Sequence, residues 1–520
     1  MRIQRHLISR PAFFALLVGS LGQISALAAE IPANRHVIVV VWDGMRPDFI
    51  SEQNTPTLWK LAQQGVTFRN HHAVYLSATN VNGVALATGD YPNHGGIIAN
   101  HEFRPKIDGQ KPVDVEAPEV VEKGDAISAG KYVAAPTVAE LVRRSGGRTV
   151  TAASKTVGFL EDRDVDSPNI EGSVTLSAGR AWPSESLASI VAAFGQFPKS
   201  HWDQGHWTTQ ALTEILWRDT LPPFSSLWLG EPDLTQHETA PGAPEALRAI
   251  KSSDDDLAAV LAALDRHQAR ETTDLFVVSD HGFSTIEHEI ELPKILRNAG
   301  FNVATENPQP DQIMAVGVGG SVLFYLPPRS SALAQKLVEF LQQSTYAGVI
   351  FTKEKMEGTF SFDRAMIDSR DAPDIVMSFR WDETKNQFGV AGMIDADWQR
   401  AAGKGTHATL SRFDMNNILI AAGPNFKKGL TSDLASGNVD LAPTIVKILG
   451  IPSPPMDGRV LSEAMVNAVV QLPKAETKTI EARIKFPSGT WRQTLRISQV
   501  GSTNYLDEGN GNFHPNEERK

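Results

Sequence analysis

Cysteine is absent from the 520 residues of this chain. This absence excludes disulfide bonds and thiol catalysis, and it leaves histidine and carboxylate side chains as the ligands for any metal ion. At this length a large hydrophobic core can stabilise the fold without cross-links. Hydrophobic residues make up 41% of the chain and charged residues 21%, which is typical of globular proteins rather than disordered or fibrous ones.

Long apolar runs are also missing, because no stretch after the N-terminal region approaches the length of a membrane span. The first 28 residues differ from the rest of the chain. They contain Arg2, Arg5 and Arg10, then the short apolar run Phe13–Leu21, then Ala26-Leu27-Ala28. A positive start, a short apolar run and a small-x-small site predict a cleaved signal peptide over residues 1–28, with an uncleaved membrane anchor as the alternative. We therefore expect a periplasmic or secreted protein whose mature form has no membrane span.

An excess of positive charge is lacking as well. The formal net charge is −11, and it becomes −14 without residues 1–28, since these contain three arginines and no acid. An acidic protein is a poor sequence-independent binder of polynucleotides, so polynucleotide binding is not expected. Any anionic substrate has to be held by a local site.

The chain beyond the signal peptide alternates short apolar runs with helical segments. The predicted buried strands are His36–Trp42, Arg148–Ala153, Phe224–Leu229, Asp274–Ser279, Asp374–Ser378 and Asn417–Ala421. The predicted helices are a segment opened by Thr55-Pro56 and closed by Gly65, Pro136–Ser145, Pro244–Leu264 and Asp440–Leu449. This alternation predicts an α/β sandwich with a mostly parallel central sheet and helices on both faces.

Two regions break the alternation. Residues 287–403 are richer in turns and include the strand-like run Val322–Leu326, so we interpret them as a small accessory or cap region inserted in the main domain. Residues 472–520 become polar and β-like, which predicts a C-terminal extension. The catalytic domain is then expected to span 29–471.

Acidic side chains follow three of the predicted strands. Asp43 comes directly after the first strand, Asp233 follows Phe224–Leu229 with His237 four residues later, and Asp280 and His281 end another strand. His407 lies in a separate loop. Because the carboxyl ends of parallel strands meet at one edge of a sheet, we expect these side chains to converge there. Mixed Asp and His ligands suit Zn²⁺ or a similar first-row ion, although each element alone is also typical of ordinary turns and solvated loops.

A hydroxyl-bearing segment precedes the helical run Gly83–Thr88. In one interpretation Thr79 is an ordinary helix N-cap. In the other, its hydroxyl lies where the helix N-terminus favours a phosphate, and a nearby metal ion activates it as a nucleophile. Ser77 is the competing hydroxyl.

The motifs occur in an order that resembles a known family. They are Asp43-Gly44, Ser77-Ala78-Thr79 with Asn82, Thr88-Gly89-Asp90-Tyr91-Pro92, Gly96-Ile97-Ile98-Ala99-Asn100, Glu231-Pro232-Asp233 with His237, Asp280-His281-Gly282, Gly405-Thr406-His407 and Asn438-Val439-Asp440-Leu441-Ala442-Pro443-Thr444. Together they resemble the alkaline phosphatase superfamily, nearest to its type I phosphodiesterase/nucleotide pyrophosphatase branch, from about Val37 to Ile451. The resemblance implies an alkaline-phosphatase-like fold.

The resemblance also implies two zinc ions per chain. Asp43, Thr79, Asp280 and His281 would hold the zinc that activates the nucleophile, and Asp233, His237 and His407 would hold the other. Thr79 would attack phosphorus and form a phosphothreonine, which water then hydrolyses. The side-chain amide of Asn100 would bind a non-bridging phosphoryl oxygen. The expected substrate is a small phosphorylated molecule, such as a nucleotide or another phosphate ester.

The chain departs from the branch around the nucleophile, where the usual pattern is Thr-x-Thr-Phe-Pro-Asn-His. Here Asn80, Val81 and Gly83 occupy the positions of Phe, Pro and His. Related monoesterases carry a Lys-x-Arg pair that binds the free phosphate oxygens, and this chain has Lys155 at the first position but no arginine at the second. A site with fewer cations favours a diester over the more highly charged monoester. The alternative for Lys155 is a solvated loop lysine.

The sequence therefore predicts a two-zinc phosphodiesterase or nucleotide pyrophosphatase. The main alternative is a phosphomonoesterase acting through the same site. A sulfatase-like hydrolase is disfavoured because the Cys/Ser-x-Pro-x-Arg segment is missing around Ser77. A non-catalytic binding protein is disfavoured because every metal-ligand position is filled.

Overall fold

The computed structural model describes residue 31 and residues 34–163, 170–467 and 473–516. The predicted signal peptide, residues 1–28, and the predicted boundary at 471 and 472 lie outside these residues. Within the described ranges, no helix combines the length and apolar character needed to cross a membrane.

A nine-stranded sheet forms the centre of the molecule, in the order β22-β2-β21-β10-β1-β9-β6-β7-β8. Its strands are β1 (His36–Trp42), β2 (Val66–Phe68), β6 (Thr149–Ala153), β7 (Val174–Ser177), β8 (Arg180–Trp182), β9 (Phe224–Leu229), β10 (Thr273–Val278), β21 (Leu419–Ala422) and β22 (Leu430–Ser432). The five strands from β10 to β7 run parallel, with Val39 opposite both Phe276 and Ser226. The mostly parallel sheet predicted from the apolar runs is confirmed, although β21 runs antiparallel to β10.

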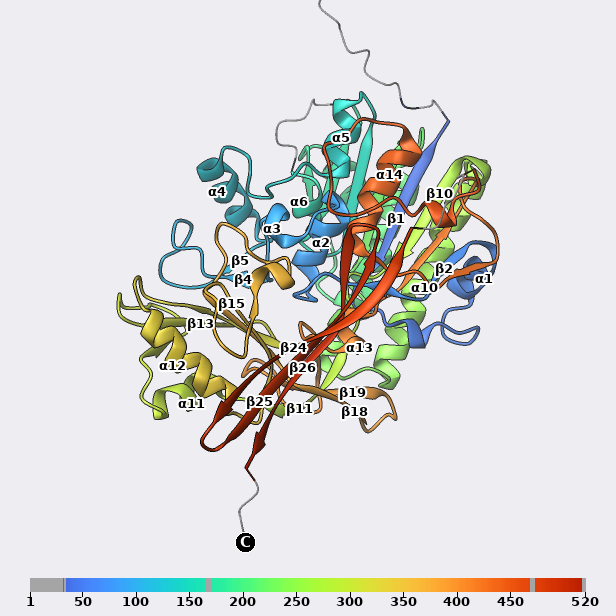
Figure 1. Ribbon diagram of the computed structural model, residues 1–520. Coiled ribbons are helices and arrows are strands. Elements are labelled where there is room, and N and C mark those ends of the chain that lie inside the picture. The colour runs from blue at the N-terminus through green and yellow to red at the C-terminus, as the bar shows by residue number, and fades with distance from the viewer. Residues whose placement is uncertain (1–30, 32–33, 164–169, 468–472, 517–520) are drawn as a thin grey trace, which may run out of the picture.

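Helices cover both faces of this sheet (Figure 1). Alternate residues of β1 point toward opposite faces, and both sets are apolar and buried. Val37, Val39 and Val41 belong to one buried cluster, and Ile38, Val40 and Trp42 belong to another. The first face is covered by α2 (Thr79–Thr88), α5 (Val138–Arg144) and α14 (Leu441–Leu449). The second is covered by α1 (Pro56–Gln64), α7 (Ser186–Phe194), α8 (His201–Gln210) and α10 (Pro244–Arg266).

The helix ends follow local chemistry. Helix α5 begins with a capping box, in which the Thr137 hydroxyl accepts from the Glu140 backbone and the Glu140 carboxylate accepts from the Thr137 backbone. Helix α14 ends at Gly450, whose left-handed conformation closes it. Shorter helices are α3 (Pro92–Gly95), α4 (Pro118–Ser128), α6 (Gly158–Glu161), α9 (Asp233–Glu238) and α13 (Arg412–Met415).

A second, six-stranded sheet lies within residues 287–403, in the order β12-β13-β14-β17-β15-β16. Its strands are β12 (Val303–Ala304), β13 (Ile313–Gly317), β14 (Ser321–Tyr325), β15 (Ala347–Thr352), β16 (Phe360–Ser361) and β17 (Ile375–Phe379), with helices α11 (Leu292–Asn298) and α12 (Ser331–Gln342) beside them. The prediction that Asp374–Ser378 joins the parallel central sheet is wrong, since β17 pairs antiparallel with β14 and β15. An apolar run indicates that a strand is buried, but it does not identify its partners.

Small sheets complete the architecture. One has the order β18-β19-β11-β20 and consists of β18 (Trp381–Lys385), β19 (Ala391–Ala396), β11 (Ser284–Glu289) and β20 (Gly405–Thr406). Two pairs are β3 (His71–His72) with β23 (Ser436–Gly437), and β4 (His101–Glu102) with β5 (Val113–Asp114).

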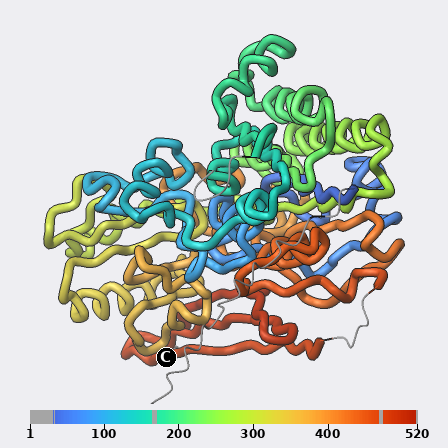
Figure 2. The backbone as a smooth tube through the Cα atoms, turned by 90° about the horizontal axis from the view of Figure 1, so that it is seen from above, coloured from blue at the N-terminus to red at the C-terminus, as the bar shows by residue number. Residues whose placement is uncertain are grey.

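The C-terminal region forms a three-stranded antiparallel meander. Its strands are β24 (Ala475–Phe486), β25 (Gly489–Val500) and β26 (Thr503–Pro515). Figure 2 shows these red strands along one side of the molecule, beside the yellow and orange accessory region. Gln493 joins the two: its Oε1 accepts from Ile350 N at 2.8 Å and its Nε2 donates to Ile350 O at 3.1 Å. Trp491 is fully buried and its Nε1 donates to Gly358 O at 3.0 Å.

We expect Trp491→Ala to lower the free energy of unfolding by about 3–5 kcal/mol, because it leaves a large cavity and an unpaired carbonyl. Trp59→Ala is the matched control, since Trp59 is exposed on α1 and its loss should change stability by less than about 1 kcal/mol. Urea denaturation monitored by circular dichroism measures both. Equal effects of the two substitutions would show that the meander does not stabilise the accessory region.

Candidate metal and active site

The carboxyl ends of three neighbouring strands carry the acidic side chains of the site. Asp43 follows β1, Asp233 begins α9 just after β9, and Asp280 follows β10. The Asp43 amide donates to Leu229 O at 3.0 Å, and the Asp233 amide donates to Asp43 O at 3.0 Å, so the two loops are held together by their backbones. Parallel pairing thus places carboxylates from distant parts of the sequence at one edge.

Three histidines face these carboxylates in a fixed orientation. The Nδ1 atom of His281 lies 2.8 Å from Gly282 O, that of His237 lies 3.0 Å from Gly405 O, and that of His407 lies 2.9 Å from Ser77 O. A carbonyl oxygen only accepts, so each Nδ1 carries a proton, and each imidazole in its neutral form presents Nε2 as an acceptor. This orientation by a backbone carbonyl is typical of metal-ligating histidines.

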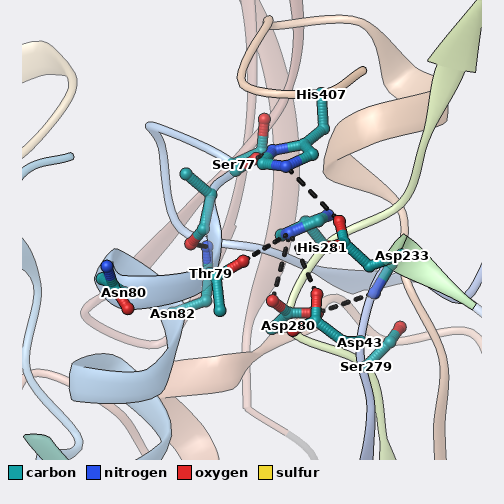
Figure 3. Close-up of polar contacts among 12 residues, drawn as sticks. Asp43, Ser77, Thr79, Asn80, Asn82, Asp233, Ser279, Asp280, His281 and His407 are labelled. Carbon is teal, nitrogen blue, oxygen red and sulfur yellow. Dashed lines mark hydrogen bonds and ion pairs between the residues drawn. The ribbon is translucent and has the colours of Figure 1, made fainter. Parts of the chain in front are cut away.

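The Nε2 atoms point at carboxylate oxygens, as Figure 3 shows for His281 and His407. His237 Nε2 lies 3.3 Å and His407 Nε2 3.5 Å from Asp233 Oδ1. His281 Nε2 lies 3.1 Å from Asp280 Oδ2 and 3.6 Å from Asp43 Oδ1. Acceptors that face acceptors repel one another unless a proton or a metal cation lies between them.

The carboxylates are themselves held so that one oxygen stays free. Asp43 Oδ2 accepts from Trp228 Nε1 at 2.9 Å and contacts Lys155 Nζ at 2.9 Å, and Asp233 Oδ2 accepts from Lys155 Nζ at 3.1 Å. Asp280 Oδ1 accepts from Gly44 N at 3.0 Å. The opposite oxygens, Asp43 Oδ1, Asp233 Oδ1 and Asp280 Oδ2, are buried and accept no hydrogen bond from the described residues.

Burial and mutual repulsion make this group of charges costly. Burial, together with the nearby Asp280 carboxylate, raises the pKa of Asp43 well above its ordinary value. Burial alone would also raise the pKa of Asp233, but the Lys155 ammonium and His237 hold it well below that value. Burial opposes protonation of His281, yet Asp280 raises the pKa of its imidazole to about 9. The carboxylates therefore favour a positive charge at this place. A proton on His281 supplies it in the metal-free protein, and a metal cation can supply it instead.

The ligand atoms form two groups close enough to hold a metal ion. One consists of Asp233, His237 and His407, and the other of Asp43, Asp233 and His281, with the atoms of each group within 4.8 Å of one another. Asp233 belongs to both groups. Free carboxylate oxygens and neutral imidazole nitrogens are the donor set that Zn²⁺ takes in proteins, so these residues fit the ion.

Thr79 is the first residue of α2, and its hydroxyl points toward the same cluster. Its Oγ1 lies 3.4 Å from His281 Nε2. The N-cap is Ala78, and the Thr79 side chain forms no capping hydrogen bond, so the interpretation of Thr79 as an ordinary N-cap is wrong. Ser77, the competing hydroxyl, is fully buried and donates to Thr409 O at 2.8 Å.

Asn100 lies beside the start of α2. Its Oδ1 accepts from Asn80 N at 2.9 Å, and its backbone oxygen accepts from Val115 N at 3.1 Å. A backbone N–H only donates, so this contact fixes which end of the Asn100 amide is oxygen. Its NH₂ group is consequently the end left to donate to a ligand.

Lys155 follows β6 and lies between two of the predicted metal ligands. Its Nζ contacts Asp43 and Asp233, and these carboxylates with Glu116 raise the pKa of its ammonium well above the ordinary value, although burial opposes the rise. The alternative of a solvated loop lysine is therefore wrong. Its role in substrate binding stays a prediction, because in this structure its contacts are to carboxylates.

Two further residues support the site and were not identified from the sequence. Trp228 points its indole N–H at Asp43, and nothing in the strand Phe224–Leu229 distinguished it from other apolar residues. Asn438 Nδ2 donates to Asp280 O at 2.7 Å and to Asn82 Oδ1 at 2.8 Å, which links the Asp280 loop to helix α2. The motif around Asn438 was part of the family resemblance, but its spacing indicated no role for that side chain.

We expect Lys155→Met to lower the free energy of unfolding of the metal-free protein by about 3 kcal/mol, because it leaves buried carboxylates without their cation. The loss should be smaller when zinc is added, since a cation bound to the same carboxylates replaces the ammonium. Lys251→Met is the control, because Lys251 is partly exposed on α10 and should matter by less than about 1 kcal/mol. Thermal unfolding with and without zinc measures this, and an equal loss in both conditions would contradict the interpretation.

Comparison with known proteins places this arrangement in a family. Residues 37–384 match the model of the type I phosphodiesterase / nucleotide pyrophosphatase family. The chain is 20% identical over 424 residues to ectonucleotide pyrophosphatase/phosphodiesterase family member 7 of Rattus norvegicus, covering 81% of this chain and 85% of that protein. It is 21% identical over 440 residues to family member 5 of Homo sapiens, covering 82% and 77%. It is 20% identical over 454 residues to the bis(5'-adenosyl)-triphosphatase enpp4 of Mus musculus, covering 86% and 84%.

Solved structures show the same fold. An inactive variant of murine ectonucleotide pyrophosphatase / phosphodiesterase 5 in complex with AMP superimposes with a TM-score of 0.60 at 18% identity, covering 83% of this chain and all of that one. The human counterpart gives the same TM-score at 17% identity. The predicted alkaline-phosphatase-like sandwich is confirmed. The chain belongs to the type I phosphodiesterase/nucleotide pyrophosphatase family and is a hydrolase of phosphoric esters.

Proposed function

We propose that this chain is a two-zinc phosphodiesterase or nucleotide pyrophosphatase that acts through a phosphothreonine at Thr79. The observation that supports it best is the arrangement of three imidazoles, each with Nδ1 at a backbone carbonyl and Nε2 at a free carboxylate oxygen, with the Thr79 hydroxyl beside them. Asp43, Asp280 and His281 with Thr79 would hold one zinc ion, and Asp233, His237 and His407 the other. The ions would supply Lewis-acid stabilisation of the nucleophile and of the leaving oxygen.

The chain's own residues orient the reaction. Helix α2 fixes Thr79 at its N-terminus, where backbone N–H groups and the helix dipole favour an anionic phosphoryl group. The Thr79 oxygen attacks phosphorus in line, the leaving oxygen departs on the opposite side, and water then hydrolyses the phosphothreonine. The NH₂ group of Asn100 would donate to a non-bridging oxygen. The backbone N–H of Asn80 supports this orientation, because it already donates to Asn100 Oδ1.

The proposed substrate is a small phosphorylated molecule such as a nucleotide or another phosphate ester. The names of the relatives favour this class, since one is a bis(5'-adenosyl)-triphosphatase and the structure of another contains AMP. A diester or anhydride is favoured over a monoester because Lys155 is the one lysine among the described residues that contacts these carboxylates, and two of them already neutralise it. A phosphomonoesterase using the same residues is the second candidate. The signal-peptide pattern of residues 1–28 supports a periplasmic or secreted location.

The proposal predicts two zinc ions per chain in gently purified protein, measured by elemental mass spectrometry. His407→Ala should bind about one ion fewer, because it removes a ligand of one group while the other remains. His206→Ala is a matched control, since His206 is exposed on α8 and should not change the metal content. Fewer than one metal ion per wild-type chain would contradict the two-zinc site.

Hydrolysis rates test the nucleophile and the substrate class together. An aryl phosphodiester should react at least about tenfold faster than the matching monoester, because the site has too few cations for a second phosphate charge. Thr79→Ala should lower kcat by at least about a thousandfold. Ser77→Ala should retain most of the activity, because the Ser77 hydroxyl donates to a carbonyl. Full activity in Thr79→Ala would remove the nucleophile, and a tenfold monoester preference would favour the second candidate.

A further inference from the structure

The turn between α3 and β4, residues 96–100, ends at Asn100 beside the start of helix α2. Its three apolar side chains are fully buried. A buried turn needs hydrogen-bond partners for its backbone N–H groups, because water does not reach them. The Glu102 carboxylate is that partner: its Oε1 accepts from Ile98 N at 2.8 Å and from Ala99 N at 3.2 Å. A side chain two residues beyond Asn100 therefore holds the backbone just before it.

Glu102 is itself fully buried, and a buried carboxylate needs a cation beside it. Arg104 supplies the cation, since its Nε lies 3.0 Å and its Nη2 2.9 Å from Glu102 Oε2. The same Nη2 donates to Gly96 O at 2.7 Å, at the start of the turn. Both ends of the turn are therefore bonded to one buried ion pair, which we call the Glu102–Arg104 pair.

The Glu102–Arg104 pair is also connected to the other contacts of Asn100. The Arg104 guanidinium lies over the Tyr132 ring, 4.8 Å from its centroid. Tyr132 OH donates to Val115 O at 3.0 Å, and Val115 N donates to Asn100 O at 3.1 Å. The Asn100 side-chain oxygen accepts from the backbone at the start of α2. The backbone and the amide oxygen of Asn100 are thus both fixed, and its NH₂ group is the part left to donate to a ligand.

The direction of a hydrogen bond to the reacting phosphoryl group affects the rate. A donor that already points at the developing charge lowers the barrier, and a displacement of about 1 Å can cost about a hundredfold. Directional bonds at both ends of a turn restrict its backbone more than apolar packing does, because a buried polar network is stable only when all of its members are paired.

We propose that the Glu102–Arg104 pair is a positioning device for Asn100, which holds the turn so that the Asn100 amide donates to the phosphoryl oxygen in the transition state. This inference rests on the proposed function, and it adds to that function a residue that acts only through Asn100. Among the described residues, the Glu102 carboxylate bonds to the turn and to Arg104 and to no predicted metal ligand. Loss of the pair should therefore lower kcat without changing the metal content.

Single and double variants of the zinc-loaded protein test the proposal, with methyl para-nitrophenyl phosphate as the diester. Asn100→Ala should lower kcat by about a hundredfold, because it removes one donor to the developing charge. Glu102→Gln should lower kcat by about tenfold with little change in KM, since glutamine keeps the size and one acceptor but loses the ion pair. Adding Glu102→Gln to Asn100→Ala should cost less than about twofold more, because the residue that the pair positions is already gone.

Glu140→Gln is the matched control. Glu140 is also buried, its Oε2 accepts from Thr137 N at 3.1 Å, and its Oε1 lies 3.1 Å from Arg163 Nη2, but it caps helix α5 instead of the turn before Asn100. Its substitution should change kcat by less than about twofold. Arg104→Lys is the second test variant, since lysine keeps the positive charge but not the planar guanidinium, and it should give the same pattern with a smaller loss.

The outcomes separate the positioning role from the proposed function. Wild-type kcat in both Glu102→Gln and Arg104→Lys would overturn the positioning role and leave the phosphodiesterase assignment intact. A loss from Glu102→Gln that is as large in the Asn100→Ala background as in the wild type would do the same, as would a loss of zinc from Glu102→Gln in elemental mass spectrometry. No nitrophenol release by the wild-type protein would overturn the assignment and the positioning role together.

Discussion

This site depends on one constraint. Hydrogen-bond acceptor atoms face one another at the carboxyl edge of the sheet. Lys155 contacts two of the three buried carboxylates, and three imidazoles fixed by backbone carbonyls direct Nε2 at carboxylate oxygens. Such a group repels itself, and only a rigid framework can hold it together before a cation arrives. The parallel strands β1, β9 and β10, buried between two hydrophobic layers, provide that framework.

This constraint explains why so many side chains around the site orient others. Trp228 and Lys155 occupy one oxygen of their carboxylates and so turn the other toward the histidines. Asn438 connects the Asp280 loop to Asn82, whose own amide donates to Val74 O and Ala78 O ahead of Thr79. One hydrogen-bond network therefore sets the positions of both Thr79 and the predicted metal ligands.

The strand-end carboxylates could be predicted from the sequence because parallel pairing is a local consequence of alternating strands and helices. Once the strands are parallel, Asp43, Asp233 and Asp280 must meet. The sequence does not predict which strand or side chain will be the partner of another. Trp228 and Asp43 are 185 positions apart, and β17 has the same apolar run as a central strand although it belongs to another sheet. Neither contact leaves a periodic signal in the sequence, because each depends on how separate layers pack.

The proposed ligands are spread along most of the chain, from Asp43 just after the first strand to His407 after residues 287–403. No fragment made early during synthesis contains either complete metal group, since both include Asp233 and the last histidine of one follows the entire inserted sheet. A metal ion therefore cannot bridge either group until residues from distant parts of the chain have been brought together. Metal binding is therefore coupled to formation of the sheet edge at which β1, β9 and β10 lie side by side.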